Sequence, residues 1–416
     1  MSRVREAHEI VQLIASASPQ IEEEVAAVSS VLRSWGYDVR VMAPLTRPFA
    51  RQLKSVGVRA QDVREPTGDS VSARYADVRH IARLLRAANP LLVHAHGLRS
   101  AAAAAVARHG APRPPLVVSP HALPHLLDED PKMGLRGQVS GWLLRRADAV
   151  VVETQTQRED LGQFDEQVGE RAEMVPYSLP VGDQPDSLDL GRRRSLLGIT
   201  QGAVVIGCVV DALEEEALEM FLGAAASVCM DYPSLEFALI GREMDISQMQ
   251  ERAHARGVLG ATVFVDPHDR FRRAIAALNV LVTPQRGWPS GMLALQALAA
   301  EVGVVAIEGG EVAEMLMGHA RVTLASADGA EALGQAIIRR LRVAAQQMRP
   351  EREQVVETPS IAPFLVSRAF YDLGESWATP ERHGGAEDDT AIDPAETFAP
   401  TKAARALIGI YQRLLE

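Results

Sequence analysis

Residues 9–42 read EIVQLIASASPQIEEEVAAVSSVLRSWGYDVRVM. Glu9–Ala15 is an apolar run of strand length, and the apolar residues after it recur every three or four positions, as in a helix with one buried face. Gly36 ends this helical pattern, and Tyr37–Met42 is expected to form the next strand. The order strand, helix, strand predicts two parallel strands joined by a crossover helix.

The same alternation continues through most of the chain and is interrupted once. Further strands are expected at residues 91–95, 116–119, 149–153, 203–210, 235–240, 261–265, 279–283, 303–306 and 320–324. The interruption, residues 178–194, is rich in Pro, Gly, Asp and Ser, as linkers are. We therefore predict an α/β protein with two facing, Rossmann-like, doubly wound parallel-sheet domains, residues 1–180 and 195–376. Ligands of such sheets bind at the carboxyl ends of the strands, so we expect a site in an interdomain cleft.

The end of the chain contains two further segments. Residues 377–399 are rich in Gly, Asp and Glu and read as an acidic loop. Residues 400–416 predict a final amphipathic helix, because Leu407, Ile410 and Tyr411 fall on one side of a helical period.

The composition is typical of a folded globular protein. Of the 416 residues, 47% are hydrophobic and 23% are charged, so each domain is long enough to bury a core. Cys208 and Cys229 fit no zinc motif and are expected to be reduced core residues. The N-terminal residues carry early charge and a short, interrupted apolar run. We therefore expect no signal peptide, no transmembrane span and a cytoplasmic location.

The charge is distributed unevenly. The formal net charge is −11, and the excess acid lies almost wholly after residue 180. This argues against nucleic-acid binding by the C-terminal half. The N-terminal half is nearly neutral but contains many arginines, which leaves open a weak contact with a membrane surface.

Several segments together carry a family resemblance. In chain order they are His94–Gly97, Ala147–Val152, Val175–Pro176, Leu235–Gly241, Ala276–Pro284, Gly291–Ala306 and Phe398–Leu415. Their order and spacing resemble the family 4 (group 1) retaining glycosyltransferases. The resemblance implies the GT-B fold, with a C-terminal helix that crosses back to the first domain. It is a weaker guide to activity, because one fold supports many functions.

The resemblance implies transfer of a sugar, with retention, from a nucleotide diphosphate donor in polysaccharide or glycoconjugate synthesis. It implies no cofactor and no bound metal. Family members use a glycine-rich loop near the N-terminus, an Arg and a Lys at the start of the second domain, and two Glu eight positions apart. Glycine lets backbone N–H groups approach a phosphate, and the cations neutralise the departing diphosphate.

All three elements differ in this sequence. The loop position, Ala17–Glu22, contains no glycine, and Pro19 removes one N–H donor. Cys208 stands after Gly207 where Arg is expected, and Glu214–Glu216 follow in place of Lys. We interpret these three acids as the solvated first turn of a helix, stabilised by the helix dipole.

The two glutamate positions fall at Trp288 and Gln296. Gln296 can still hydrogen-bond a ribose, but as an uncharged amide. Trp288 cannot replace a carboxylate, and it either stacks on a sugar or base or packs at a domain interface.

Backbone features of a donor site remain. Ser290, Gly291 and Met292 are expected to open a helix whose free N–H groups form a latent anion site. Gly241, at a strand end, leaves room for a base or ribose. The candidate donor-binding residues are therefore Gly241, Trp288, Ser290, Gly291, Met292 and Gln296.

Four histidines cluster in the sequence: His94, His96, His121 and His125. His94 and His96 lie on one face of a strand end and match the acceptor-side motif of the family. His121 follows strand 116–119, where family members place a histidine that contacts the transferred sugar. It is the candidate catalytic residue, or else a cleft-lining side chain with no present role. No carboxylate or cysteine completes a recognisable zinc spacing, so we predict no metal site.

Two functions remain open. One is an active retaining glycosyltransferase with a nucleotide-sugar partner. The other, favoured by three separate losses, is an inactive pseudo-glycosyltransferase that binds or scaffolds a protein partner. A third interpretation is a GT-B epimerase or an enzyme with another donor, in which Arg242 or Arg286 would supply a relocated phosphate contact.

Overall fold

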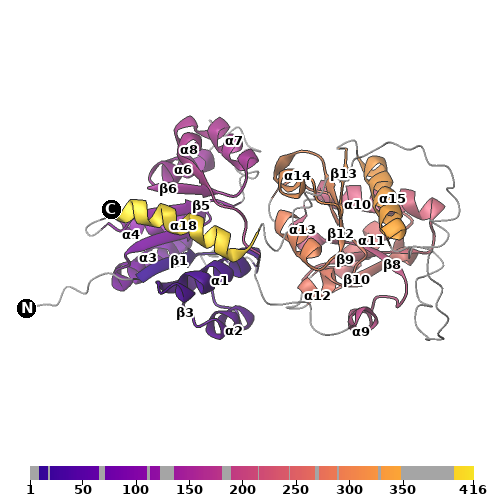
Figure 1. The fold of residues 1–416 in the computed structure, drawn as a ribbon, viewed down its shortest axis with the longest axis horizontal. Coiled ribbons are helices and arrows are strands. Elements are labelled where there is room, and N and C mark those ends of the chain that lie inside the picture. Colours follow the sequence, from indigo (N-terminus) through magenta and orange to yellow (C-terminus); the bar gives the residue numbers. More distant parts are fainter. Residues whose placement is uncertain are drawn as a thin grey trace, which may run out of the picture. The chain divides into compact units, whose positions relative to one another are not determined.

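The chain consists of two compact units. The computed structural model describes residues 9–16, 19–64, 71–109, 113–121, 135–179, 189–213, 215–242, 244–267, 271–287, 290–326, 329–347 and 398–416. Unit 1 comprises residues 1–182 and 395–416, and unit 2 comprises residues 183–394 (Figure 1). Most of the predicted acidic loop, residues 377–397, lies outside the described residues.

Unit 1 contains a seven-stranded parallel sheet, sheet A. Its strands are β1 (Glu9–Ile14), β2 (Asp38–Ala43), β3 (Arg59–Asp62), β4 (Leu92–His96), β5 (Leu116–Ser119), β6 (Ala149–Val152) and β7 (Ala172–Met174). Their order is β3-β2-β1-β4-β5-β6-β7, so the direction in which the sheet grows reverses between β1 and β4. The five strands predicted for this unit are confirmed, and the two edge strands β3 and β7 are additional.

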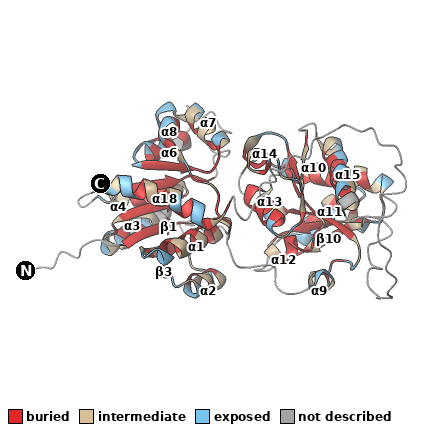
Figure 2. Cartoon of the chain, viewed as in Figure 1, coloured by how far each residue is buried: buried red, intermediate tan, exposed pale blue. Residues whose placement is uncertain are grey.

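Helices cover both faces of sheet A. They are α1 (Pro19–Ser34), α2 (Arg47–Ser55), α3 (Val71–Ala88), α4 (Leu98–Ala107), α6 (Leu135–Arg145), α7 (Gln155–Phe164), α8 (Glu166–Arg171) and α18 (Pro400–Leu415). One core cluster joins β1, β2 and β4–β6 to α1 and α18, and a second joins the same strands to α3, α4, α6 and α7. Figure 2 shows the central strands largely buried between these two layers, whereas the edge strand β3 is mostly exposed.

The last helix, α18, belongs to unit 1 although it follows unit 2 in sequence. Its residues Leu407, Ile410 and Tyr411 are at most 4% exposed and pack on the α1 side of sheet A. A backbone hydrogen bond of 2.8 Å runs from Leu179 N–H to the Phe398 carbonyl. It joins the segment before α18 to the last part of unit 1 that precedes unit 2 in the sequence. The predicted return of the C-terminal helix to the first domain is thereby confirmed.

Unit 2 contains a six-stranded parallel sheet, sheet B. Its strands are β8 (Val204–Val209), β9 (Leu235–Ile240), β10 (Thr262–Val265), β11 (Val280–Thr283), β12 (Gly303–Ile307) and β13 (Val322–Ala325), in the order β10-β9-β8-β11-β12-β13. Each strand lies where the apolar runs predict it. The order reverses between β8 and β11, as it does between β1 and β4 in sheet A.

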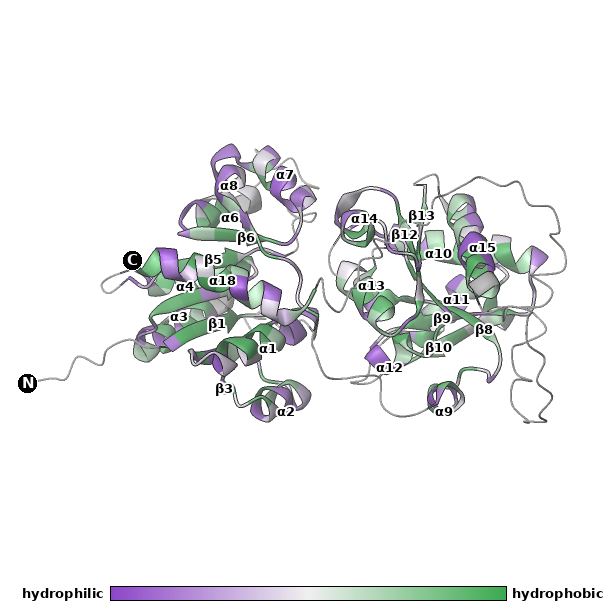
Figure 3. Ribbon diagram, in the orientation of Figure 1, coloured by the Kyte–Doolittle hydropathy of each residue, from purple (hydrophilic) through white to green (hydrophobic). Residues whose placement is uncertain are grey.

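Short and long helices flank sheet B. They are α9 (Leu190–Leu196), η1 (Val210–Ala212), α10 (Glu215–Asp231), α11 (Ile246–Ala255), η2 (Leu259–Ala261), α12 (Phe271–Ile275), α13 (Ser290–Ala299), α14 (Gly310–Leu316) and α15 (Ala330–Gln347). Figure 3 shows hydrophobic strands in both units, while the helices carry hydrophilic residues as well. Among the described helices, none is both long enough and apolar enough to span a membrane.

Helix α9 begins inside the stretch that the sequence assigns to the linker. Its Arg194 is 3% exposed and donates to the carbonyls of Ala277 and Ala203 and to Asn279 Oδ1. The sequence assigns the GRRR segment to the linker, but this guanidinium satisfies three buried or partly buried acceptors and anchors α9 to unit 2.

The docking of α18 can be tested by truncating one buried side chain. Leu407→Ala is expected to lower the free energy of unfolding of unit 1 by about 2–4 kcal/mol, because it leaves a cavity in the core. Urea unfolding is followed by the fluorescence of Trp35 and Trp142, which lie in unit 1, after Trp288→Phe and Trp377→Phe remove the other two tryptophans.

Leu415→Ala is the matched control, since Leu415 is on the same helix but is 40% exposed. It is expected to change the unfolding free energy by less than about 0.5 kcal/mol. Equal effects of the two substitutions would contradict the packing of α18 on sheet A.

Candidate functional site

Polar side chains gather at the carboxyl edge of sheet A, where the strand order reverses. Gln12 of β1 is in register with His94 of β4, and His96 follows two residues later. All three lie on the face covered by α1 and α18, because Ile10 and Leu92, each two residues earlier, belong to that core. The predicted same-face placement of the two histidines is confirmed, with ring centroids 4.3 Å apart.

Tyr411 of α18 starts a chain of buried hydrogen bonds at this edge. Its hydroxyl lies 2.6 Å from His94 Nδ1 and accepts from Gln12 Nε2 over 3.2 Å. His94 Nε2 lies 2.9 Å from Ser119 Oγ at the end of β5. Burial, together with the nearby charge of His121, lowers the pKa of His94 to about 3, so this ring is neutral. The neutral ring therefore donates through one nitrogen and accepts through the other, with the hydroxyls of Tyr411 and Ser119 as its two partners.

The orientation of the Gln12 side-chain amide determines which atoms donate and which accept in the remaining hydrogen bonds. With its N–H groups toward Tyr411, its Oε1 accepts from His96 Nε2–H over 2.8 Å. Burial holds the pKa of His96 well below its usual range, so His96 is neutral and its Nδ1 is an acceptor. His121 Nε2 lies 3.1 Å from that atom and must therefore donate to it. The proton positions of His96 and His121 are thus coupled to one amide.

His121 is the last member of this series of hydrogen bonds, and it lies beside a carboxylate. Its Nδ1 lies 2.9 Å from Glu153 Oε1, and the two side chains are 2% and 3% exposed. His121 follows β5 with a backbone φ of 57°, in the left-handed region that non-glycine residues seldom adopt. That turn aims the ring across the edge of the sheet toward Glu153, the residue that follows β6.

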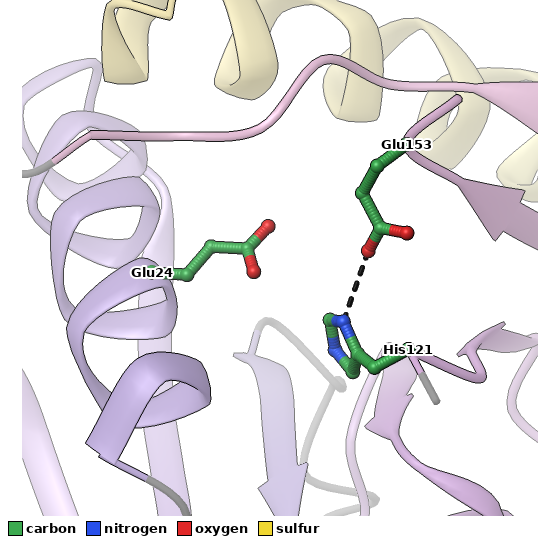
Figure 4. Close-up of side chains that lie close together, drawn as sticks. All are labelled: Glu24, His121 and Glu153. Atoms are coloured by element: carbon green, nitrogen blue, oxygen red, sulfur yellow. Dashed lines mark ion pairs between the residues drawn. The ribbon is translucent and has the colours of Figure 1, made fainter. Parts of the chain in front are cut away.

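A second carboxylate completes the cluster. Glu24 of α1 points toward His121 and Glu153 (Figure 4), and one donor atom from each of the three residues lies within 4.8 Å of the others. Burial raises the pKa of Glu24 to about 7, with Glu153 adding to the rise and His121 opposing it. We call Glu24, His121 and Glu153 the strand-edge cluster.

Sequence reasoning found only part of this arrangement. It singled out His94, His96 and His121, which the structure brings together; His125 lies outside the described residues. It missed five partners, namely Gln12, Glu24, Ser119, Glu153 and Tyr411. Two of these left a signal, because Gln12 is a polar residue inside an apolar strand and Glu153 directly follows one. Glu24 and Tyr411 sit in amphipathic helices, where nothing in the sequence marks them.

In unit 2 the predicted donor residues cluster at the start of α13. Ser290, Gly291 and Met292 form its first turn and are buried, and Gln296 is 8% exposed. A side chain at position 291 would lie 2.8 Å from Met315 Sδ, so glycine suits the contact with α14. Trp288 lies outside the described residues.

Gly241 follows β9 and is needed for local packing. A Cβ there would lie 2.4 Å from Val210 Cγ2 and 2.6 Å from Asp211 Oδ1. Asp211 accepts from the backbone N–H of Arg242 through both oxygens, at 3.0 and 2.9 Å. The guanidinium of Arg242 lies over the ring of Phe271, 5.1 Å from its centroid. Arg242 is therefore already engaged by its neighbours.

The position expected to hold a catalytic Arg faces the core. Cys208 is fully buried in β8 among the apolar residues of sheet B, and burial raises the pKa of its thiol far above the usual range. Glu215 and Glu216 are exposed in the first turn of α10, and Glu215 pairs with Arg252 at 2.9 Å. This agrees with a solvated first turn; Glu214 lies outside the described residues.

Arg286 occupies the carboxyl edge of sheet B at its order reversal. It is exposed, three residues beyond the end of β11. Its carbonyl accepts from Val312 N–H over 3.2 Å, and its side chain lies 3.9 Å from the Cβ position of Gly309. Gly309 and Gly310 have φ of 79° and 75°, and a Cβ on Gly310 would lie 2.9 Å from that of Arg286. The two glycines let this arginine pack against the start of α14.

The burial of Glu24 predicts a pH-dependent penalty in stability. Its folded pKa of about 7 exceeds the ordinary 4.5, so as the pH rises the unfolded chain loses this proton first and becomes favoured. In EDTA-containing buffer, Glu24→Gln should therefore match the wild type below about pH 4.5. Above pH 7 it should be more stable by up to about 3 kcal/mol. Urea unfolding of unit 1 as a function of pH measures the difference.

Glu23→Gln is the control, because it removes the same charge from the neighbouring, partly exposed position on α1. Its stability difference from the wild type should change little over the same pH range. A Glu24→Gln variant that loses stability as the pH rises would show that this carboxyl is ionised and favourably paired.

Comparisons with known proteins place both units in one family. The family model described as "Glycosyl transferase 4-like domain" matches residues 21–178, and that described as "Glycosyl transferases group 1" matches residues 202–342. The lipopolysaccharide core biosynthesis mannosyltransferase LpsB of Rhizobium meliloti is 23% identical over 192 residues. That match covers 44% of this chain and 53% of LpsB, so the chain aligns with about half of that relative's length.

Solved structures agree in fold. HepE of Anabaena, in complex with UDP-glucose, has a TM-score of 0.68 at 15% identity, over 97% of this chain and 99% of HepE. A glycosyltransferase from Rickettsia africae has a TM-score of 0.64 at 11% identity, over 99% of each chain. With the two family models and the paired parallel sheets, these likenesses lead to one conclusion: the chain belongs to the family 4 (group 1) glycosyltransferases of the GT-B fold.

Proposed function

We propose that this chain binds a nucleoside diphosphate, or its sugar derivative, at the carboxyl edge of sheet B and has little or no transferase activity. The observation that carries the proposal is the position of Arg286. It is an exposed guanidinium at the order reversal of sheet B, the place where doubly wound sheets bind nucleotides. Among the described residues, no Asp or Glu forms an ion pair with this guanidinium.

Arg286 has the chemistry to replace the missing cations. A guanidinium donates two parallel N–H bonds to a phosphate and stays charged at any relevant pH. The first turn of α13 begins four residues later, and the N–H groups of Gly291 and Met292 have no acceptor within the helix. Together they supply fixed charge and backbone donors for a diphosphate.

The residues that would drive sugar transfer are not replaced in the same way. Cys208 points into the core, Arg242 is held by Phe271 and Asp211, and Gln296 carries no charge. Stabilising a departing diphosphate together with a developing positive charge on the sugar needs several preorganised charges. Binding without turnover is therefore the function that these side chains support best.

An active retaining transferase is the alternative. It is favoured by the kinship with LpsB, named as a mannosyltransferase, and by the fold shared with HepE, which binds UDP-glucose. In that case His121 would contact the sugar, directly or through the cluster it belongs to. An inactive chain would instead work through a protein partner.

Calorimetric titration with UDP, GDP, UDP-glucose and GDP-mannose tests the proposal. We expect one of them to bind. Arg286→Ala should weaken it by about 10–100-fold, as loss of a charge-assisted bond to phosphate does. Arg242→Ala, which removes an equal charge from the same edge, should change the affinity by less than about threefold.

Chromatography of the same mixtures for free nucleotide and free sugar separates binding from turnover. Binding without release of sugar supports the proposal. Absence of binding to every nucleotide, or equal losses in the two arginine variants, contradicts it. Steady release of sugar supports the transferase alternative.

A further inference from the structure

We propose that Glu24, His121 and Glu153 form a buried site for one divalent transition-metal ion, best matched by Zn²⁺. The strand-edge cluster offers two carboxylate oxygens and one imidazole nitrogen, which lie within 4.8 Å of one another. Such a donor set is typical of divalent cations that are intermediate between hard and soft. The two carboxylates neutralise the two positive charges of the ion. The site lies wholly in unit 1 and is independent of the nucleotide site proposed for unit 2.

Each carboxylate of the cluster has a buried oxygen without a hydrogen-bond partner among the described residues. Glu24 Oε2 and Glu153 Oε2 accept no hydrogen bond from any of the residues that the structure describes. The two residues are 9% and 7% exposed, and both carboxylates face His121 (Figure 4). An ionised carboxylate in such surroundings is costly unless a cation or a proton satisfies it. This burial distinguishes the cluster from a solvated group of acids.

The spacing suits coordination after small side-chain movements. Two ligands at about 2.1 Å from one ion are about 3.0 Å apart at a right angle and about 3.4 Å apart in a tetrahedron. His121 Nδ1 and Glu153 Oε1 are 2.9 Å apart. Placing an ion between these two atoms therefore needs an opening of roughly 0.5 Å or less. Glu24 reaches the ion by rotating its flexible side chain.

The hydrogen-bond chain prepares His121 to act as a ligand. A histidine that binds a metal through one nitrogen donates its other N–H to a protein acceptor, which fixes the tautomer. Here His121 Nε2 donates to His96, whose own Nε2–H donates to Gln12 over 2.8 Å. The lone pair needed for coordination is thereby left on Nδ1, the atom that faces Glu153. Gln12 and His96 are thus positioning residues.

The surroundings favour a small ion with few ligands. Gln12, His94, His96 and Ser119 line a cavity with both carboxylates, and its volume of about 10 Å³ is close to what one water needs. Val25, Val151 and Leu407 supply apolar walls. Three protein donors and one water make four ligands, the number usual for Zn²⁺. Ca²⁺ takes six to eight oxygen ligands and does not fit.

This ligand set differs from the one tested in the sequence. His94 and His96 are not ligands, because both ring nitrogens of each already have partners among Tyr411, Ser119, Gln12 and His121. The carboxylates that complete it come from α1 and from the residue after β6, with 128 intervening residues between Glu24 and Glu153. No spacing rule detects such a pair.

The test is zinc competition against a chromophoric chelator, using the full chain after EDTA treatment and buffer exchange. We expect one tight site per chain. Glu24→Gln and Glu153→Gln should each weaken it by more than about 100-fold, since each removes a ligand. Glu23→Gln, the same change at the adjacent position, should leave the affinity within about threefold. Circular dichroism confirms that each variant is folded.

A positioning variant and a spectroscopic probe complete the test. Gln12→Leu removes no ligand but releases the tautomer, and it should weaken zinc binding by about 10–100-fold. Co²⁺ in place of Zn²⁺ should give visible bands that Glu24→Gln abolishes and Glu23→Gln preserves. The proposal is overturned if the wild type binds no zinc, if both glutamate variants bind it normally, or if Co²⁺ shows the charge-transfer band of a cysteine thiolate.

Discussion

The side-chain amide of Gln12 is the interaction on which the described part of unit 1 most depends. It bonds Tyr411, 399 residues away in the sequence, and His96 on the neighbouring strand. An amide has a donor end and an acceptor end, so its orientation determines which nitrogen of each following imidazole carries the proton. A neutral apolar residue at this position would leave Tyr411, His96 and, through it, His121 without a defined arrangement.

The chain of bonds also explains why the first and last parts of unit 1 fold together. Tyr411 of α18 touches β1 through Gln12 and β4 through His94, while His121 and Glu153 connect β5 and β6. Every member is buried, and a buried polar group left without its partner costs more than a lost contact at the surface. The strand edge therefore specifies one arrangement of elements that the apolar core alone would hold less uniquely.

The backbone of unit 2 has the same reversal of strand order as unit 1. The charged residues at the carboxyl edge of its sheet differ from those that the family resemblance implies. Its sheet reverses order between β8 and β11, and α13 starts beyond the end of β11. The backbone N–H groups at the start of α13 thus lie at the carboxyl edge of sheet B. Cys208 faces the core and Arg242 is engaged by Asp211 and Phe271, and for this reason the proposed function assigns the phosphate contact to Arg286. This combination of scaffold and charge is the basis of the binding role proposed above.

The sequence predicts the sheets well because their strands are buried on both faces and therefore read as continuous apolar runs. It does not reveal β3, an edge strand of mostly exposed polar residues, or β7, which has only three residues. Of the strand-edge cluster it identifies His121 alone. Glu24 reaches the site because α1 packs on that face of the sheet, and helical periodicity does not show where a buried carboxylate will point. Trp288, on which much of the sequence argument rests, lies outside the described residues.

The tautomeric states of the histidines test this account most directly. Long-range ¹H–¹⁵N correlation spectra of the histidine-labelled protein distinguish Nδ1–H, Nε2–H and doubly protonated rings. The account predicts that His94 and His96 stay neutral throughout the neutral pH range, that His96 carries its proton on Nε2, and that Gln12→Leu removes this single tautomer of His96. Protonated rings at either position, or a proton on Nδ1 of His96, would contradict the direction of the chain and everything inferred from it about His121.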